Sequence, residues 1–411
     1  MYFSIILEQK VEINMIRNEI KLLLSNRMNK ILLIFLFAIA VSFSIFAAWS
    51  ISFVDDNGNT HNGIFAPRKL SEKKSKYVGK LNPDVFEDVI KKDKKIKSIY
   101  KNQIPEKIYA TNMQEYMDIK DFMVSTLSYG SEMDYEKFDF LEVSKAKNIY
   151  HIRKENIKKL VKEYGVTEKK MKYLKEKFSK NKTPFYYEPA DSWITMGLYA
   201  TTYSLILIIG ISFLVSGIFT EDFKLKADSI FFSTKLGKNK GVKIKIGTGL
   251  LMTTIIYWAL MLSLCIISFT IMGVSGAKSP IQLEYSYCIY NYTFFERYLL
   301  IIIGGYIGSI FASVVTMLTS AKTHSSLLSL CIPIILFVVS PFIGRVLPFE
   351  NFFKVTPDQL VNIYNCIKLP ILYEIFGHVF MQIPIIIILY LLISIILIPF
   401  IYFTFRKYGQ K

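Results

Sequence analysis

The sequence predicts an all-α membrane protein with six transmembrane helices and a mainly helical extracellular domain between the first and second. Hydrophobic residues make up 52% of its 411 residues and the mean hydropathy is +0.33, more apolar surface than a soluble domain buries. Six long runs contain no Asp, Glu, Lys or Arg, and each meets the need of a spanning helix for about 20 apolar residues. A polar stretch of domain size with helical periodicity separates the first two runs.

These runs divide the chain. The expected parts are a cytoplasmic amphipathic helix (1–30), the first transmembrane helix (31–53), the extracellular domain (54–193), transmembrane helices two to six (194–403) and a cytoplasmic tail (404–411). The five later spans are expected at 194–219, 246–273, 298–319, 326–344 and 379–403. Prolines interrupt the fifth and sixth spans.

The distribution of Lys and Arg orients the helices. With both termini inside, the short segments on that side carry sixteen basic residues, whereas the short connections 274–297 and 345–380 carry five. Cytoplasmic loops are enriched in Lys and Arg, so both termini are expected in the cytoplasm of a bacterial cell, with the protein in the plasma membrane. Long loops cross the membrane largely regardless of charge, so residues 54–193 are expected outside.

The first segment repeats Ile13, Ile16, Ile20 and Leu23 at helical spacing, which predicts an amphipathic helix on the inner leaflet. A plain cytosolic extension of the first span is the alternative. The run from Ile31 is too long for a signal-peptide core and is expected to stay as an anchor. Both Met1 and Met15 are suitable starts, and the choice between them stays open.

The extracellular domain is expected to contain helices at 83–97, 113–127 and 151–180, because apolar stripes there alternate with Lys and Glu. It contains no cysteine and therefore does not rely on disulfides. Its run KKDKKIK, residues 91–97, is either a solvated helix face or a contact for anionic lipid or wall polymers.

Residues 220–245, TEDFKLKADSIFFSTKLGKNKGVKIK, form the cytoplasmic connection between the second and third spans. Thr220 is suited to cap a short helix, which Gly237 and Gly241 would end. The segment is either a helix that docks on a soluble partner or an ordinary basic loop. The residues expected to make the docking contact, through one apolar face and an acidic first turn, are Glu221, Asp222, Phe223, Ala227, Ile230 and Phe231.

Two further features concern packing. Gly304, Gly308 and Ala312 recur at intervals of four in the fourth span, a small-residue stripe that allows close helix approach and indicates a helix-packing face. The connection 345–378 is too apolar for an exposed loop and contains three prolines. It is expected to form short re-entrant helices that dip into the outer leaflet.

Several classes of function lack their motifs. There is no phosphate loop, no H-E-x-x-H, and the four histidines are scattered without metal-ligand spacing, so no cofactor or metal is expected in this chain. The spans lack the ionisable groups that ion-coupled transporters use. No nucleic-acid partner is expected either. Whether Cys288 and Cys366, both on the outer side, form a bridge stays open.

The N-terminal amphipathic helix, six spans, the short helical loop between spans two and three and the semi-buried connection before the last span together resemble type 2 ABC exporter permeases. Within that group the chain is similar to Firmicute permeases with a large extracellular insert between the first two spans. The resemblance implies that residues 221–236 are the coupling helix that contacts an ATPase. It also implies that residues 342–378 are the outer re-entrant helices.

The expected function is therefore the permease subunit of an ATP-driven exporter that moves an amphipathic peptide, lipid or drug. Cytoplasmic ABC ATPase subunits would bind the ATP, a second permease copy or a sister permease would complete the path, and membrane lipid would surround it. This subunit is not expected to be an enzyme itself. The alternative is an ATPase-coupled sensory or mechanical protein whose extracellular domain controls a wall enzyme or signalling partner without transport. An intramembrane enzyme is the least favoured class, because polar groups at membrane depth are nearly absent.

Overall fold

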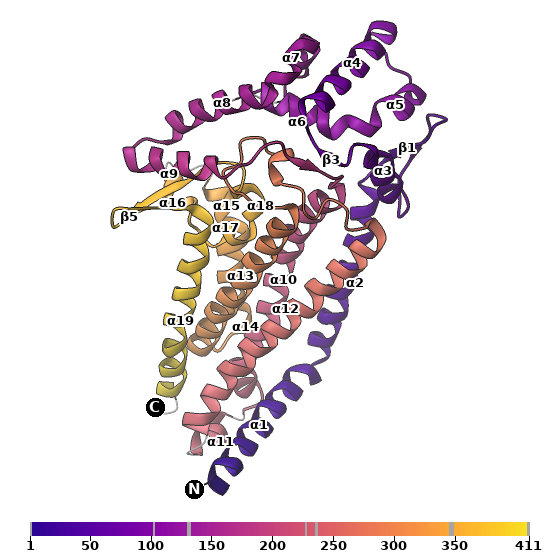
Figure 1. The fold of residues 1–411 in the computed structure, drawn as a ribbon. Coiled ribbons are helices and arrows are strands. Elements are labelled where there is room, and N and C mark those ends of the chain that lie inside the picture. Colours follow the sequence, from indigo (N-terminus) through magenta and orange to yellow (C-terminus); the bar gives the residue numbers. More distant parts are fainter. Residues whose placement is uncertain are drawn as a thin grey trace.

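The computed structural model describes residues 2–101, 103–129, 133–226, 228–234, 237–344 and 349–408, which are mostly helical (Figure 1). Six helices are long and apolar enough to cross a membrane, which confirms the expected number. They comprise Arg27–Trp49, Asp191–Lys224, Asn239–Met272, Phe294–Thr323, Ser326–Ile343 and Gln382–Lys407. Most extend beyond the expected spans, because polar residues at their ends continue the helix.

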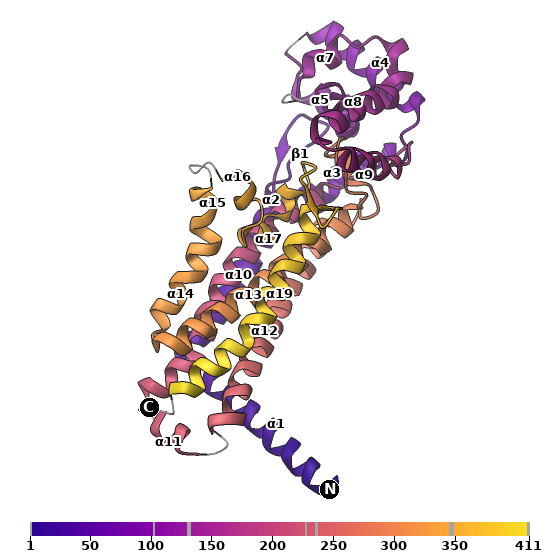
Figure 2. The same ribbon diagram turned by 90° about the vertical axis from the view of Figure 1, so that its left-hand side faces the viewer.

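The six helices run side by side as one bundle. Its main helices are α2 (Arg27–Trp49), α10 (Asp191–Lys224), α12 (Val242–Met272), α13 (Phe294–Thr323), α14 (Ser326–Ile334) and α19 (Gln382–Tyr408). The most buried are α10 and α13, whereas α14 lies at the edge (Figure 2). The fifth span widens into a π turn at Ile335–Val339 and ends in α15 (Ser340–Ile343), whose Pro341 cannot donate a backbone hydrogen bond.

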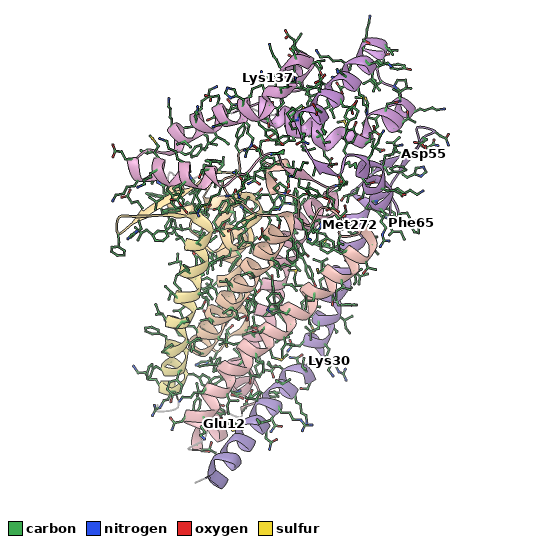
Figure 3. The ribbon with its side chains drawn as sticks, in the orientation of Figure 1. Glu12, Lys30, Asp55, Phe65, Lys137 and Met272 are labelled. Atoms are coloured by element: carbon green, nitrogen blue, oxygen red, sulfur yellow. The ribbon has the colours of Figure 1, made fainter. Side chains whose placement is uncertain are left out.

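The start of α1 (Tyr2–Ser25) and the end of α19 lie at one end of the bundle, called here the terminal end; the opposite end is the insert end (Figure 1). Figure 3 shows Glu12 and Lys30 toward the terminal end and Met272 at the insert end. Asn26 separates α1 from α2, and its side chain accepts a hydrogen bond from the Met28 N–H at 2.9 Å. On α1, Leu23 is buried against the bundle while Ile13 is 64% exposed.

The insert between α2 and α10 is mainly helical, as expected. It contains α3 (Ala66–Lys74), α4 (Pro83–Tyr100), α5 (Glu106–Asn112), α6 (Met117–Leu127), α7 (Tyr135–Asp139), α8 (Ile149–Tyr164) and α9 (Glu168–Ser179), with 3₁₀ turns at Ser75–Tyr77, Gln114–Tyr116 and Val143–Asn148. Two antiparallel strand pairs tie its ends: β1 (Phe53–Val54) with β2 (Thr60–His61), and β3 (Gly79–Lys80) with β4 (Tyr186–Tyr187). The helix expected over 151–180 is two helices, because the chain turns at Gly165.

A glycine is required at position 165 for a steric reason. A Cβ on this residue would lie 2.3 Å from the Val161 carbonyl oxygen and 3.0 Å from Met171 Cα, so only glycine lets α9 fold back along α8. The insert also packs on the connection between α12 and α13, which contains a 3₁₀ turn at Ile281–Leu283. Arg153 Nε donates to the Ser286 carbonyl oxygen of this connection at 2.8 Å. Arg68 Nε donates to the Ile271 carbonyl oxygen, at the end of α12, at 2.9 Å.

The connection before the last span contains three short helices, α16 (Glu350–Phe353), α17 (Asp358–Val361) and α18 (Ile363–Cys366). A hairpin that the sequence analysis did not predict follows, β5 (Leu372–Ile375) paired antiparallel with β6 (His378–Met381). Its turn residues Phe376 and Gly377 have φ of 49° and 80°, typical of a type I′ turn. Residues 345–348 of the expected re-entrant segment lie outside the described residues.

Cys288 and Cys366 do not form a disulfide. Cys265, Cys288, Cys331 and Cys366 are all free thiols. The Cys288 thiol instead lies 3.3 Å from the Ile367 carbonyl oxygen, next to Cys366 in the chain.

Candidate functional site

The candidate site lies at the terminal end, where the sequence analysis placed its docking residues. Glu221, Asp222 and Phe223 belong to the last turn of α10, which continues to Lys224. The expected single helix from 221 to 236 is therefore wrong in its bounds. Thr220 does not cap a helix, since its hydroxyl lies inside α10, 3.1 Å from the Ser216 carbonyl oxygen and 2.7 Å from Ser326 Oγ of α14.

A short helix, α11 (Asp228–Ser233), follows after α10 ends. It contains Ile230, whose side chain is not described, and Phe231, whereas Ala227 lies outside the described residues. The expected turn at Gly237–Gly241 is a π-helical turn that leads directly into α12. The connection thus consists of the end of α10, the short α11 and an immediate return into the third span.

Lys245 is the most deeply buried charge at this end, with 1% of its side chain exposed. Its Nζ lies 3.0 Å from Glu19 Oε2 of α1, 3.2 Å from Asp222 Oδ2 of α10 and 3.2 Å from the Ile218 carbonyl oxygen. A buried ammonium group requires such partners to offset its lost hydration. Lys245, Glu19 and Asp222, called here the Lys245 node, therefore fasten α1, α10 and α12 at one point.

Two further polar contacts extend this junction. Asn26 Nδ2 donates to Glu221 Oε1 at 3.1 Å, which ties the start of α2 to the end of α10. Lys240 Nζ lies 3.3 Å from Glu12 Oε1, which ties the π-helical turn to α1. The helix α1 is thereby attached to the α12 side of the connection, and the start of α2 is attached to its α10 side.

The aromatic residues of the connection point into the bundle. Phe405 of α19 is fully buried. Its ring centroid lies 4.6 Å to 6.0 Å from those of Phe219, Phe223, Phe231 and Phe232. Apolar burial explains why this set, called here the Phe405 cluster, holds α11 against α19. Phe223 and Phe231, expected to contact a partner, are thus partly buried, whereas Leu225 between α10 and α11 is 66% exposed.

His324 adjoins this cluster at the end of α13. Its ring centroid lies 3.9 Å from that of Phe223, and its backbone is left-handed, with φ of 54°. Burial lowers the pKa of the imidazole, while the nearby Asp228 acts in the opposite direction. The ring is therefore neutral at pH 7.

The insert end contains a second buried lysine. Lys74 of α3 is 5% exposed, and its Nζ lies 2.5 Å from Asp118 Oδ1 and 2.7 Å from Asp191 Oδ1. Burial alone would lower the pKa of Lys74, but the two carboxylates outweigh it and raise that pKa well above its usual range. Lys74, Asp118 and Asp191, the Lys74 node, fasten the insert to the first residue of α10.

The small-residue stripe of α13 faces two neighbours. A Cβ on Gly304 would lie 2.4 Å from the Leu360 carbonyl oxygen of α17. One on Gly308 would lie 3.0 Å from Ile208 of α10, and Ala312 is fully buried. Both glycines therefore stand where neighbouring elements approach α13 closely.

The sequence analysis missed both lysine nodes. Lys245 was counted among the basic residues of a loop, and Lys74 was not singled out. The partners of both lysines lie far away in the sequence. The one available signal was that Lys245 directly precedes the apolar run that begins at residue 246. Within the part of the chain that the structure describes, no group of three His, Cys, Asp or Glu side chains is placed to hold a metal ion.

Six helices long and apolar enough to cross a membrane indicate a multi-pass membrane protein. No family model matches the chain, and no curated protein matches it either. The described residues of the site bring several helices together at one short connection. The contacts of α11, the Lys245 node and the Phe405 cluster join one short connection to α1, α10, α12 and α19.

Proposed function

We propose that this chain is the permease subunit of an ATP-driven exporter, with the terminal end in the cytoplasm. Separate ABC ATPase subunits would bind ATP and press on the connection between α10 and α12. A second permease copy or a sister permease would complete the transport path. The cargo would be amphipathic, a peptide, a lipid or a drug, in keeping with apolar spans.

One observation carries this proposal: α10 is a single unbroken helix from the Lys74 node to the connection at the terminal end. Its 34 residues span about 50 Å, at 1.5 Å per residue. A load on α11 would reach α19 where Phe231 packs on Phe405. It would reach α10 where Phe405 packs on Phe223, and it would reach the Lys245 node where the Phe231 ring lies 5.5 Å from Lys245 Nζ. Displacement at one end of such a rod moves the other end, which is how rigid elements couple distant sites.

The test is affinity purification of the detergent-solubilised chain from its native membrane, with identification of copurifying chains and an ATPase assay. Leu225→Glu places a charge on the exposed tip of the connection and should abolish copurification of an ATPase while leaving the thermal midpoint unchanged. Lys30→Glu, an exposed change at the same end, should retain the partner. An eluate without any ATP-binding subunit in the wild type would refute the proposal.

A second candidate function is supported by the Lys74 node, because movement of α10 would also move the insert. In this alternative the ATPase drives the insert to control a wall enzyme or signalling partner, without transport. Lys74→Met loosens the insert from α10 and should then abolish signalling. Under the exporter proposal, the movement of α10 drives efflux, so efflux is the activity to measure in the same variant.

A further inference from the structure

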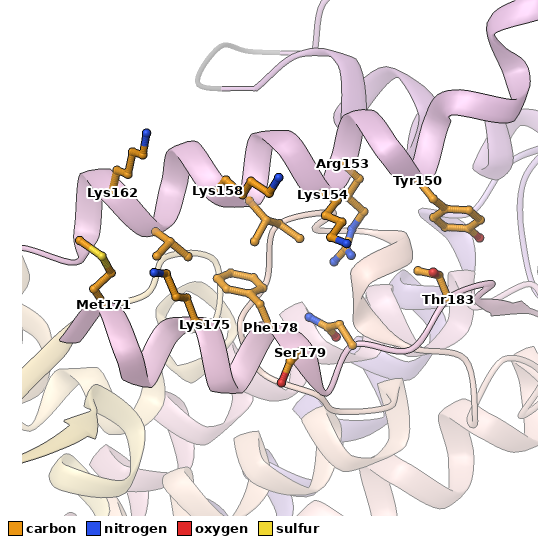
Figure 4. A pocket seen from close by; sticks show the side chains of 13 residues that line it. Tyr150, Arg153, Lys154, Lys158, Lys162, Met171, Lys175, Phe178, Ser179 and Thr183 are labelled. Carbon is orange, nitrogen blue, oxygen red and sulfur yellow. The ribbon is translucent and has the colours of Figure 1, made fainter. Parts of the chain in front are cut away.

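A cavity of about 720 Å³ lies between α8 and α9 of the insert, far along the chain from the site described above (Figure 4). This volume is within the roughly 300–1,000 Å³ typical of small-molecule sites. In Figure 4, Arg153 extends from α8 toward α9, and Phe178 extends from α9 toward α8. The helix α9 in turn rests on the β5–β6 hairpin, where Lys169 Nζ lies 3.3 Å from Glu374 Oε1.

The lining combines two chemistries. Its apolar side chains are Ile157, Val161, Met171 and Phe178. Its basic side chains are Arg153, Lys154, Lys158, Lys162 and Lys175, and no Asp or Glu is among the described residues that line it. An apolar wall bordered by cations is complementary to a molecule with an apolar chain and an anionic head.

Most of these lysines are not neutralised by the protein. Lys158 pairs with Glu155 at 2.7 Å. Over the described ranges, Lys154, Lys162 and Lys175 form no ion pair. Charge runs on helices often serve solubility alone, so the lysines by themselves do not define a site.

Arg153 supplies the decisive observation. It is 3% exposed, its guanidinium lies 4.9 Å from the ring of Phe185, and its Nη2 has no hydrogen-bond acceptor among the described residues. The Nδ2 of Asn181, which lines the same cavity, is also buried without an acceptor. Buried donors are nearly always paired, so two unpaired donors on residues that line one cavity indicate a missing acceptor. Burial lowers the pKa of Arg153 to about 10, which leaves the guanidinium charged at neutral pH.

We propose that the cavity between α8 and α9 binds a small anionic amphiphile. Its phosphate or carboxylate oxygens accept hydrogen bonds from Arg153 Nη2 and Asn181 Nδ2, and its chain covers Ile157, Val161 and Phe178. The lysines surround the head and draw it in from solution. This inference does not rest on the exporter proposal, since the cavity lies within the insert.

The experiment uses the full chain held in a non-ionic amphipol, which leaves no free micelles and adds no competing anion, and measures binding of radiolabelled dodecyl phosphate by equilibrium dialysis. We expect saturable binding of one molecule per chain. Inorganic phosphate, with the head but no chain, and dodecyl maltoside, with the chain but no charge, should not displace it at tenfold excess. Laurate distinguishes the head groups: displacement by laurate extends the site to carboxylates, and its failure restricts the site to phosphate; both support an anionic amphiphile.

Variants locate the binding. Arg153→Gln should weaken affinity about tenfold, the loss expected for one charge-assisted hydrogen bond. Because that variant alters a buried residue, Ile157→Trp provides a second test: it fills the cavity without changing charge and should also weaken affinity by about tenfold or more. Lys175→Met should cost about threefold, as exposed charge pairs do. Lys172→Met, the same change on α9 outside the cavity, should have no effect.

Four results would overturn the proposal. Equal displacement by inorganic phosphate would mean a simple anion site, and equal displacement by dodecyl maltoside an uncharged apolar crevice. Unchanged binding in both Ile157→Trp and Lys175→Met would place the amphiphile elsewhere. Binding of an acidic peptide with none of dodecyl phosphate would assign the cavity to a different class of partner.

Discussion

The two ends of α10 carry the same set of charges in opposite electrostatic surroundings. At each end a buried lysine lies between two carboxylates, one of which belongs to α10 itself: Asp191 at its first residue and Asp222 in its last turn. The positive end of a helix dipole stabilises anions, and the negative end opposes them. Asp191 is therefore favoured by the helix, whereas Asp222 depends on Lys245.

The ion-pair distances are also shorter at the insert end, where the helix dipole favours Asp191. Lys74 Nζ lies 2.5 Å and 2.7 Å from its carboxylates, whereas Lys245 Nζ lies 3.0 Å and 3.2 Å from its own. The junction with the insert is thus the tighter one. At the terminal end the ion pairs of the Lys245 node are longer.

The largest expected effect is that of Lys245→Met. It leaves Glu19 and Asp222 without a cation, one of them at the negative end of α10, and should lower the free energy of unfolding by about 3–5 kcal/mol. Thermal unfolding of the purified chain measures this. Lys30→Met, which removes an exposed lysine at the same end, should change little.

Lys74→Met should cost about 1 kcal/mol less than Lys245→Met, because the helix dipole still stabilises Asp191. The same unfolding measurement applies, with the exposed Lys69→Met on α3 as its control. A larger loss for Lys74→Met than for Lys245→Met would show that contact distance, rather than the helix dipole, decides the difference between the two ends.

A direct comparison of the two carboxylates sharpens this point. Asp191→Asn removes a favourable anion from the start of α10, whereas Asp222→Asn removes an unfavourable one from its end and leaves Glu19 to pair with Lys245. Asp191→Asn should therefore be the more destabilising by about 1 kcal/mol. Equal effects of the two variants would contradict the dipole argument.

The smallest expected effect is a pH dependence at the terminal end. Because burial lowers the pKa of His324 in the folded chain, the unfolded chain binds more protons as pH falls below about 6.5. The contribution of neutral His324 is present above that pH and is lost as pH falls through the folded pKa.

His324→Asn tests this, since asparagine tolerates the left-handed backbone. The wild type should lose slightly more of its thermal midpoint between pH 7.5 and pH 5.5 than the variant does. Parallel curves would exclude His324 as the source. The Lys74 node provides the contrast, because its lysine stays charged throughout this range.

The sequence predicted the features that local patterns encode. Apolar runs predicted the six spanning helices, and helical periodicity predicted the helical insert. The bounds at the connection were wrong because Asp222, which suggested the start of a helix, is neutralised by Lys245 at the end of one. No local pattern places Glu19 beside a residue 226 positions away.

The cavity of the insert shows the same limit. Lys154, Lys158 and Lys162 stand four residues apart and were visible as a stripe, as was the neighbouring Ile157. This stripe faces Phe178 because the chain reverses direction at Gly165. Arg153 is buried because it packs against Ser286, which lies in a distant connection. Tertiary packing, rather than periodicity, makes a site of these residues.

The position of the insert between α2 and α10 has a consequence for biogenesis. At synthesis rates of about 5–20 residues per second, the chain needs roughly 7–28 s to pass from the end of α2 to the start of α10. During that interval α2 is in the bilayer without α10 and α12, on which it packs in the finished bundle. Its buried Ser44, which pairs with Ser268 of α12 at 2.9 Å in the finished bundle, must meanwhile bond to its own helix, as it does to the Ala40 carbonyl oxygen. The hydroxyl of Ser44 is thus satisfied within α2 even before α12 packs against it.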